Sequence, residues 1–131
     1  MMVGRGLLAS LFALACAAPA AGQPQVACRY TYGGETLELV AEPVDSPYGV
    51  EGVAVGSYFR FRVVFQDRPV DLASIKIYTY ADRDEGPVPI HQASFPYPPH
   101  DQGSGHGFTG MQFVYESVRD GELQYWCRLK P

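Results

Sequence analysis

Apolar and polar side chains alternate along residues 56–65, whose sequence is GSYFRFRVVF. Because successive Cβ atoms of a strand point to opposite sides, this period of two predicts a half-buried β-strand. Burying the four apolar side chains of one face would contribute roughly 6–12 kcal/mol before conformational entropy is subtracted. We therefore expect this strand to be central in a sheet. Its buried face comprises Phe59, Phe61, Val63 and Phe65, and its other face Tyr58, Arg60, Arg62 and Val64.

The first 22 residues carry the features of an export signal. Arg5 supplies a positive charge, residues 7–15 form an apolar run, and positions 18–20 offer small residues for cleavage. The run is shorter than the ~20 apolar residues that a membrane-spanning helix needs, and no later segment approaches that length. We therefore predict a signal peptide at residues 1–22, no transmembrane segment, and a periplasmic or secreted protein.

The mature chain, residues 23–131, is small and acidic. Its length of 109 residues, which is 131 minus 22, suits a single domain. Loss of Arg5 leaves nine Lys and Arg residues against fourteen Asp and Glu residues, a net charge of −5. Basic stripes are what bind the phosphates of nucleic acids and of anionic membranes. Since the mature chain has no such stripe, we expect neither as a partner.

Two cysteines, Cys28 and Cys127, remain after cleavage. A cysteine pair in an exported chain most often forms a disulfide, whereas metal-binding or redox pairs usually have a Cys-x-x-Cys spacing, which is absent here. We predict a disulfide that joins the first and last strands, and closing a loop of about 100 residues would contribute up to ~4–5 kcal/mol. Cys16, which follows Leu14 and Ala15, is the position at which a lipid anchor would be attached as an alternative to simple cleavage.

Further alternating runs predict a series of short strands. Residues 26–32 and 35–41 flank Gly33 and Gly34, and two glycines between alternating runs are typical of a β-hairpin, because its turn needs positive φ angles. The other expected strands are residues 52–55, 70–81, 90–95 and 108–116, together with a last strand that buries Leu123, Tyr125, Cys127 and Leu129.

Turn-forming residues separate these runs. Clusters of charged residues, glycine and proline predict turns at residues 66–69, 82–89 and 119–121. Residues 96–107 form the longest irregular stretch, and a loop of this length in a small domain is either mobile or functional. In the strand that follows this loop, the shared parity of Met111, Phe113 and Tyr115 predicts that all three face the core.

Short strands between turns, without helical periodicity, predict an all-β fold. For a chain of this length the arrangement is a small antiparallel β-sandwich, with a small barrel as the alternative. The segment Tyr125-Trp126-Cys127 resembles the Tyr-x-Cys signature of immunoglobulin domains, and this resemblance implies an immunoglobulin-like sandwich. The cysteine spacing is longer than in those domains and the tryptophan adjoins the cysteine, so the resemblance concerns architecture and not family membership.

The loop at residues 98–107 contains the chemistry of a candidate metal site. His100 and His106 supply imidazoles and Met111 a thioether, and soft ligands of this kind suit copper in an exported protein. His91 could supply a third nitrogen if its strand runs beside the loop. The alternative is that the two histidines are exposed on a polar loop and Met111 lies in the core. The spacing matches no specific metal template.

Two other groups of residues have the types found in functional sites, but their patterns favour structural roles over catalysis or calcium binding. Asp101, Ser104 and His106 include the residue types of a hydrolase triad, but a glycine-flanked loop would hold them poorly and the serine lacks a nucleophile-elbow pattern. Asp82 and its acidic neighbours at residues 84–85 lack the calcium-loop pattern of an EF-hand and suit a solvated turn. We therefore expect a protein that is not an enzyme.

Arginine and tyrosine gather on the outer side of the central strands. These residue types are enriched in protein interfaces, although ordinary covering of a sheet face explains them as well. The sequence therefore suggests a small exported binding or accessory module that acts through protein–protein contacts, and a periplasmic copper-binding protein is the alternative. The candidate partner-binding residues are Tyr58, Arg60, Arg62, Tyr78 and Tyr80, and the candidate metal ligands are His100, His106 and Met111.

Overall fold

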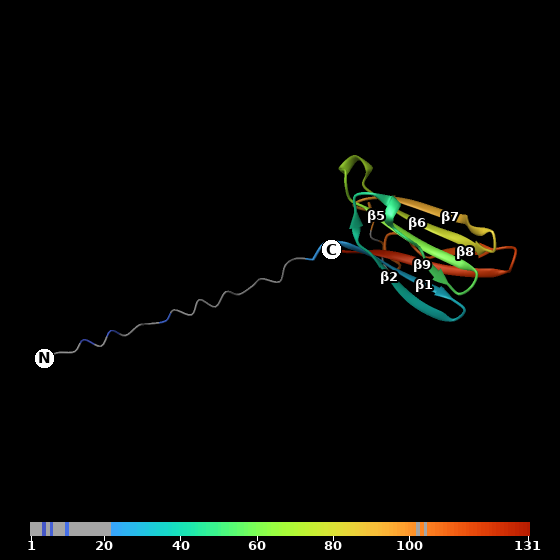
Figure 1. Ribbon diagram of the computed structural model, residues 1–131, viewed down its shortest axis with the longest axis horizontal. Helices are drawn as coiled ribbons and strands as arrows, with labels where there is room; N and C mark the ends of the chain where they lie inside the picture. The colour runs from blue at the N-terminus through green and yellow to red at the C-terminus, as the bar shows by residue number, and fades with distance from the viewer. Residues whose placement is uncertain (1–3, 5, 7–9, 11–21, 102, 104) are drawn as a thin grey trace.

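The computed structural model describes residues 4, 6, 10, 22–101, 103 and 105–131. The predicted signal peptide falls mostly outside this set, as does Cys16. The described strands form two sheets that lie face to face (Figure 1). None of the helices in the described ranges reaches the length and hydrophobicity that spanning a bilayer requires.

The first sheet has four strands in the order β2-β1-β9-β8, and all neighbours in it are antiparallel. The second has the order β3-β5-β6-β7, with β4 also paired to β5. The sandwich predicted from the sequence is therefore confirmed. The bounds are β1 Gln25–Tyr32, β2 Glu35–Ala41, β8 Gln112–Glu116 and β9 Gly121–Lys130 in the first sheet, and β3 Pro43–Val44, β4 Val53–Val55, β5 Phe59–Gln66, β6 Ser74–Arg83 and β7 Gly86–Pro96 in the second.

The β1–β2 hairpin forms as its two glycines predict. Gly33 and Gly34 have φ angles of 60° and 80°, and Tyr32 pairs with Glu35 directly before and after them. Only glycine adopts two successive positive φ angles without steric cost, so this turn sets the register of both strands.

The strand β5 is the centre of the second sheet, as its alternation predicts. Its four inward side chains are at most 2% exposed and pack against the first sheet. The Phe61 ring lies 5.2 Å from that of Tyr30 and 5.2 Å from that of Tyr125, so aromatic rings from both layers meet in the core. Val64, on the outer side of β5, is also only 2% exposed, which the alternation did not indicate.

The predicted disulfide between Cys28 and Cys127 is present and joins the first and last strands. The two residues are direct partners across β1 and β9, with a Cα–Cα distance of 4.0 Å. The bridge therefore lies within one sheet. In immunoglobulin domains the bridge connects the two sheets, so the arrangement here differs from theirs although both are sandwiches.

The side chains of β8 face opposite to the prediction. Val114 and Glu116 point inward and are 4% and 1% exposed, whereas Phe113 and Tyr115 are 61% and 57% exposed. Met111, expected in the core with them, precedes the strand and is half-buried. The inward position of a carboxylate breaks the apolar alternation, and that alternation is what the sequence pattern relies on.

The β6–β7 hairpin has longer strands and a shorter turn than expected. Strand β6 continues to Arg83 and β7 begins at Gly86, so residues 82–89 are mostly strand and not a solvated turn. Three prolines fit in β7 because it is an edge strand, where a missing N–H can face solvent. The expected start of β6 is also wrong, because Val70–Leu72 forms a short 3-10 helix.

Candidate binding site

Four of the five predicted partner-binding residues lie together on the outer face of the second sheet. Arg60 pairs with Tyr80 and Arg62 with Tyr78 across β5 and β6, so these side chains share one side. The rings of Tyr78 and Tyr80 are stacked, with 6.2 Å between their centroids. The expected proximity of these four side chains is therefore observed.

Much of this group is engaged within the protein itself. The Arg62 guanidinium donates hydrogen bonds to the carbonyl oxygens of Val50 and Pro47, both at 2.7 Å, and lies 5.0 Å from the centre of the Tyr78 ring. Arg60 forms an ion pair with Asp82 at 3.5 Å. Arg62 thus holds the loop between β3 and β4 against the sheet, which is a structural role.

Tyr58 is separate from this group and lies at the end of the sandwich. Its ring is covered by the Arg119 guanidinium at 4.3 Å, and Arg119 also donates to the carbonyl oxygens of Tyr58 and Asp82 at 3.0 Å. Arg119 reaches the buried Glu116 as well, at 3.0 Å. These contacts connect three chain segments, so Tyr58 and Arg119 close this end of the molecule.

Burial tends to raise the pKa of Glu116, but hydrogen bonds outweigh it. They come from the Arg119 side chain and from the backbone N–H groups of Val118 and Arg119, and they hold the pKa of this carboxyl below its ordinary value. Arg83 adds a further ion pair at 3.5 Å. A buried carboxylate with this many donors is typical of a structural network.

The predicted copper ligands are not brought together with His91. The Nε2 atom of His91 lies 2.6 Å from the hydroxyl of Tyr125 in the interior, where burial lowers the pKa of His91. His100 is exposed in the loop, and His106 packs edge-on against the Trp126 ring at 5.7 Å. Within the part of the chain that can be described, no group of three or more His, Cys, Asp and Glu residues has the arrangement of a metal site.

Of the three residues considered as a hydrolase triad, the structure describes Asp101 and His106. The Asp101 carboxylate accepts a hydrogen bond from the Gly103 N–H at 2.7 Å, which orders the loop locally. Ser104 lies outside the described residues.

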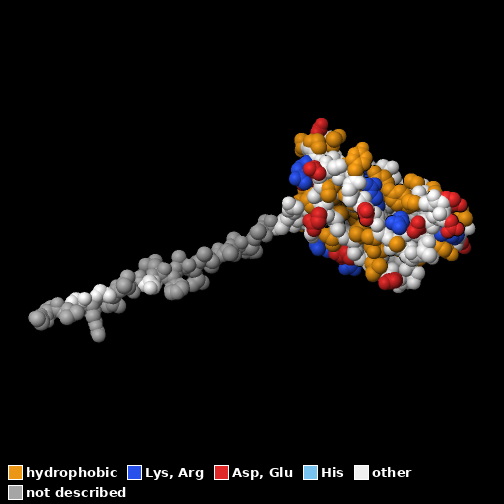
Figure 2. All heavy atoms as spheres, viewed as in Figure 1, with side chains coloured by type: hydrophobic (Ala, Val, Ile, Leu, Met, Phe, Trp, Pro, Cys, Tyr) orange, Lys and Arg blue, Asp and Glu red, His pale blue; other side chains and the backbone are white. Residues whose placement is uncertain are grey.

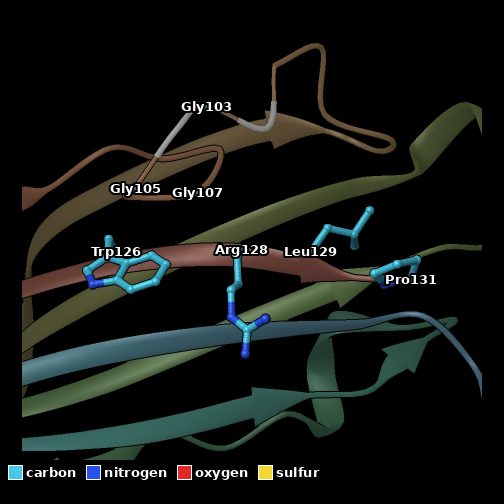
Figure 3. Close-up of a pocket in the computed structure, with 7 residues that line it drawn as sticks. All are labelled: Gly103, Gly105, Gly107, Trp126, Arg128, Leu129 and Pro131. Atoms are coloured by element: carbon cyan, nitrogen blue, oxygen red, sulfur yellow. The ribbon is translucent and has the colours of Figure 1, made fainter.

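A pocket of about 540 Å³ opens beside the end of β9 (Figure 3). It lies between the outer side of this strand and the glycine-rich loop that precedes β8. Trp126 and Arg128 project from β9 on the same side of the sheet, and the Arg128 side chain extends over β1. The residues that line it are Gly103, Gly105, Gly107, Trp126, Arg128, Leu129 and Pro131.

The loop beside this pocket is attached to β9 by hydrogen bonds to both backbone groups of Cys127. The Phe108 N–H donates to the Cys127 carbonyl at 3.0 Å, and the Cys127 N–H donates to the Thr109 hydroxyl at 2.9 Å. Thr109 is buried although it belongs to a loop. Phe108 and Thr109 therefore take the place of β8 alongside Cys127, before β8 begins at Gln112.

Two of the glycines are required by this close approach. A Cβ atom on Gly107 would clash with the Cys127 carbonyl, and one on Gly103 would clash with the carbonyl of Gly107. Both residues also have φ angles of 61°, which L-residues with a side chain seldom adopt. Glycine is therefore required at both positions.

The face around Trp126 carries further exposed apolar side chains. Phe113 and Tyr115 are exposed on β8. Val40 of β2 is 39% exposed and lies on the same side of the sheet as Arg128, because both residues pair with Ala27 of β1. We call Val40, Phe113, Tyr115, Trp126 and Arg128 the Trp126 surface. Figure 2 shows another apolar group at the tip of the loop between β5 and β6, where Val70 is 89% exposed, but that tip projects away from the sandwich.

Trp126 and Arg128 are not among the site residues predicted from the sequence. Their parity is opposite to that of Tyr125 and Cys127, which were expected to be buried, so an outward direction could have been inferred. The pocket itself could not, because it depends on where β8 begins relative to β9. Comparison with protein-family models, with curated proteins and with solved structures finds no match for this chain.

Proposed function

We propose that this protein is a small exported binding module that contacts a protein partner through the Trp126 surface. The observation that carries the proposal is the pocket between Trp126 and a loop whose conformation requires glycine at two positions. Rigid, concave sites with an aromatic residue are typical of binding surfaces, and tryptophan and arginine are enriched among the residues that dominate binding energy.

The opposite face supports binding less well. Arg62 contacts both Tyr78 and the β3–β4 loop, and a partner would have to compete with those contacts. Arg128 belongs to none of the ion pairs formed among the described residues. A charged side chain without an internal ion pair can bind a ligand without first breaking a contact within the protein.

Site-specific photo-cross-linking in the producing cells tests this proposal. A benzoylphenylalanine at position 113 samples the Trp126 surface, and the same residue at position 80 samples the Arg60 and Tyr80 face as a matched control. We expect a discrete cross-linked species from position 113 that disappears when Trp126→Ala is added. A discrete product from position 80 alone would contradict the proposal.

Export is part of the proposal and has its own test. The disulfide is compatible with an extracellular or periplasmic location. We expect the mass of the protein recovered from the exported fraction to correspond to a chain that begins near residue 23 and has both mature cysteines oxidised. A full-length protein retained in the cytoplasm would contradict export, and an added lipid mass would indicate anchoring at Cys16.

Copper binding is the second candidate, and the exposed imidazole of His106 beside Trp126 favours testing it. Trp126 is the sole tryptophan of the chain, so Cu(II) held at His106 would quench its fluorescence. If His100, His106 and Met111 form a copper site, the His100→Ala/His106→Ala variant should lose this quenching. Equal quenching in the two proteins would dismiss the site.

A further inference from the structure

The pocket beside Trp126 occupies the place where a neighbouring strand would lie. Strand β9 continues to Lys130, but β8 begins only at Gln112, which is the residue that pairs with Tyr125. Phe108 and Thr109 cover the next available position, Cys127. Beyond Cys127, the edge of β9 faces the pocket.

The backbone of Leu129 presents a donor and an acceptor to this pocket. Both backbone polar groups of Cys127 bond to the loop, away from β1, and residues two apart in a strand direct these groups to the same side. Leu129 therefore directs its N–H and C=O toward the loop side. Among the residues with described positions, we find no hydrogen-bond partner for Leu129 on that side.

A strand added to the edge of β9 beside Leu129 could not extend past Cys127. The Phe108 to Cys127 hydrogen bond blocks the edge next to Leu129, so an extended segment that enters from the Pro131 side has to stop there. The simplest segment that ends at such a point is one whose chain terminates there. Running from Pro131 toward Cys127, it would be antiparallel to β9, like the other neighbours in this sheet.

The charge of the lining indicates which terminus fits. Arg128 is the charged side chain among the residues that line the pocket, and its guanidinium suits a carboxylate, which it can bind with two parallel hydrogen bonds. Its side chain lies over β1 in Figure 3, and its long stem lets it rotate toward the pocket, a kind of rotamer change common on binding. Trp126 provides the apolar contact for the last side chain of the segment.

We infer that this pocket binds the C-terminal residues of a partner polypeptide, which add to β9 as a short antiparallel strand and place their carboxylate on Arg128. The inference rests on the proposed function and specifies its ligand. Strand addition at a free sheet edge and capture of a terminal carboxylate are both recurring modes of peptide recognition.

The fluorescence of Trp126 and the amide resonances of Leu129 and Gly107 provide the test. The probes are two pools of N-acetylated tetrapeptides that end in Leu, Val or Phe and are randomised elsewhere, one with free carboxylates and one with carboxamides. We expect the carboxylate pool to shift all three signals and the carboxamide pool to bind at least about tenfold more weakly, because a charge-assisted pair is lost.

Variants separate the two parts of the inference. Arg128→Gln should bring the carboxylate pool to the affinity of the carboxamide pool. Leu129→Pro removes the pocket-facing N–H without removing a hydrogen bond to β1, so it should weaken both pools, while Leu129→Ala retains the N–H and controls for the side chain. Amide spectra of the free variants show whether each is folded.

The outcomes distinguish this inference from the proposed function. Equal binding of the two pools, or no shift with either, would overturn the C-terminal ligand. If cross-linking from position 113 persists in that case, the Trp126 surface remains a protein-binding surface with a different ligand. If both the peptide shifts and the cross-links are absent, the proposed function fails as well.

Discussion

The hydroxyl of Tyr125 lies 2.6 Å from the Nε2 atom of His91, and this contact links the two sheets inside the sandwich. Tyr125 is on β9 and fully buried, and His91 is on the edge strand β7. Burial raises the pKa of Tyr125 and lowers the pKa of His91. Both shifts favour a neutral pair in which the tyrosine donates to the imidazole nitrogen.

This pair predicts that acid destabilises the protein in the range where histidine titrates. An unfolded chain protonates His91 below about pH 6.5, whereas the native state resists protonation, so the unfolded state binds more protons and stability falls with decreasing pH. The decline should begin near pH 6.5 and continue until the pH passes the lowered native pKa. Urea unfolding from pH 8 to pH 5 measures it.

The matched variant for this prediction is His91→Gln, whose side chain can still accept from Tyr125 but does not titrate. Its free energy of unfolding should change less between pH 7 and pH 5 than that of the wild type. His106→Gln changes a histidine outside this buried pair and is the control variant. Identical profiles for wild type and His91→Gln would refute the prediction.

Two phenylalanines test the direction of β8. Phe61 is fully buried and Phe113 is 61% exposed, although the sequence pattern placed both in the core. Phe61→Ala should lower the free energy of unfolding by about 3–5 kcal/mol, because it leaves a cavity. Phe113→Ala should change it by no more than about 0.5 kcal/mol. Comparable losses in urea unfolding would show that β8 turns its other face inward.

Two arginines test whether the outer face of the second sheet is structural. Arg62→Ala removes both hydrogen bonds to the β3–β4 loop and should lower the free energy of unfolding by about 1–3 kcal/mol. Arg60→Ala removes one partly exposed ion pair and should cost less than about 1 kcal/mol. A larger loss from Arg60→Ala would contradict the assignment of Arg62 as the residue that holds the loop.

Glycines 107 and 33 test the conformation of the pocket loop. Both have a φ angle near 60°, but a Cβ on Gly33 would meet open space, whereas one on Gly107 would clash with Cys127. Gly33→Ala should therefore cost only the backbone penalty, about 1–2 kcal/mol. Gly107→Ala should cost more and shift the emission of Trp126, since the loop has to move. Equal costs without a spectral change would mean that the loop is not held against β9.

The disulfide should account for a large share of the stability. Its cysteines are 99 residues apart, so removing the bridge releases almost the whole β-sandwich from this constraint in the unfolded state. We expect Cys28→Ala/Cys127→Ala to lose about 2–5 kcal/mol in urea unfolding. A reductant should destabilise the wild type by a similar amount and leave the variant unaffected, and equal stability of all three would disprove the prediction.

Local patterns predicted the parts of the fold that depend on neighbours in the chain. The alternation in β5 and the glycine pair at residues 33–34 are short-range signals, and the structure contains both elements. Strand β8 was assigned the wrong face because Glu116 is buried there, and its burial depends on Arg119 and Arg83, whose positions no local pattern reveals.

The candidate site was less accessible to sequence reasoning. The sequence pattern indicated that the glycine-rich loop could be functional, and it predicted that its two histidines are either copper ligands or exposed on a polar loop. It did not indicate a packing role for the glycines. Gly107 is needed because the loop lies directly against the Cys127 carbonyl, a contact between segments 20 residues apart. The outward direction of Trp126 follows from strand parity, whereas its pocket exists because β8 begins only at Gln112.

By itself, the sequence determined that this chain forms short β-strands, that two distant cysteines meet, and which side chains of β5 are buried. Each of these follows from residue type and from a period of two, which act over a few residues. Only the tertiary structure decided that the bridge lies within one sheet, that Arg62 holds the β3–β4 loop, and that β9 has a free edge beside Trp126. Those features depend on which strands become neighbours and where each one stops, and both are set by packing between segments far apart in the chain.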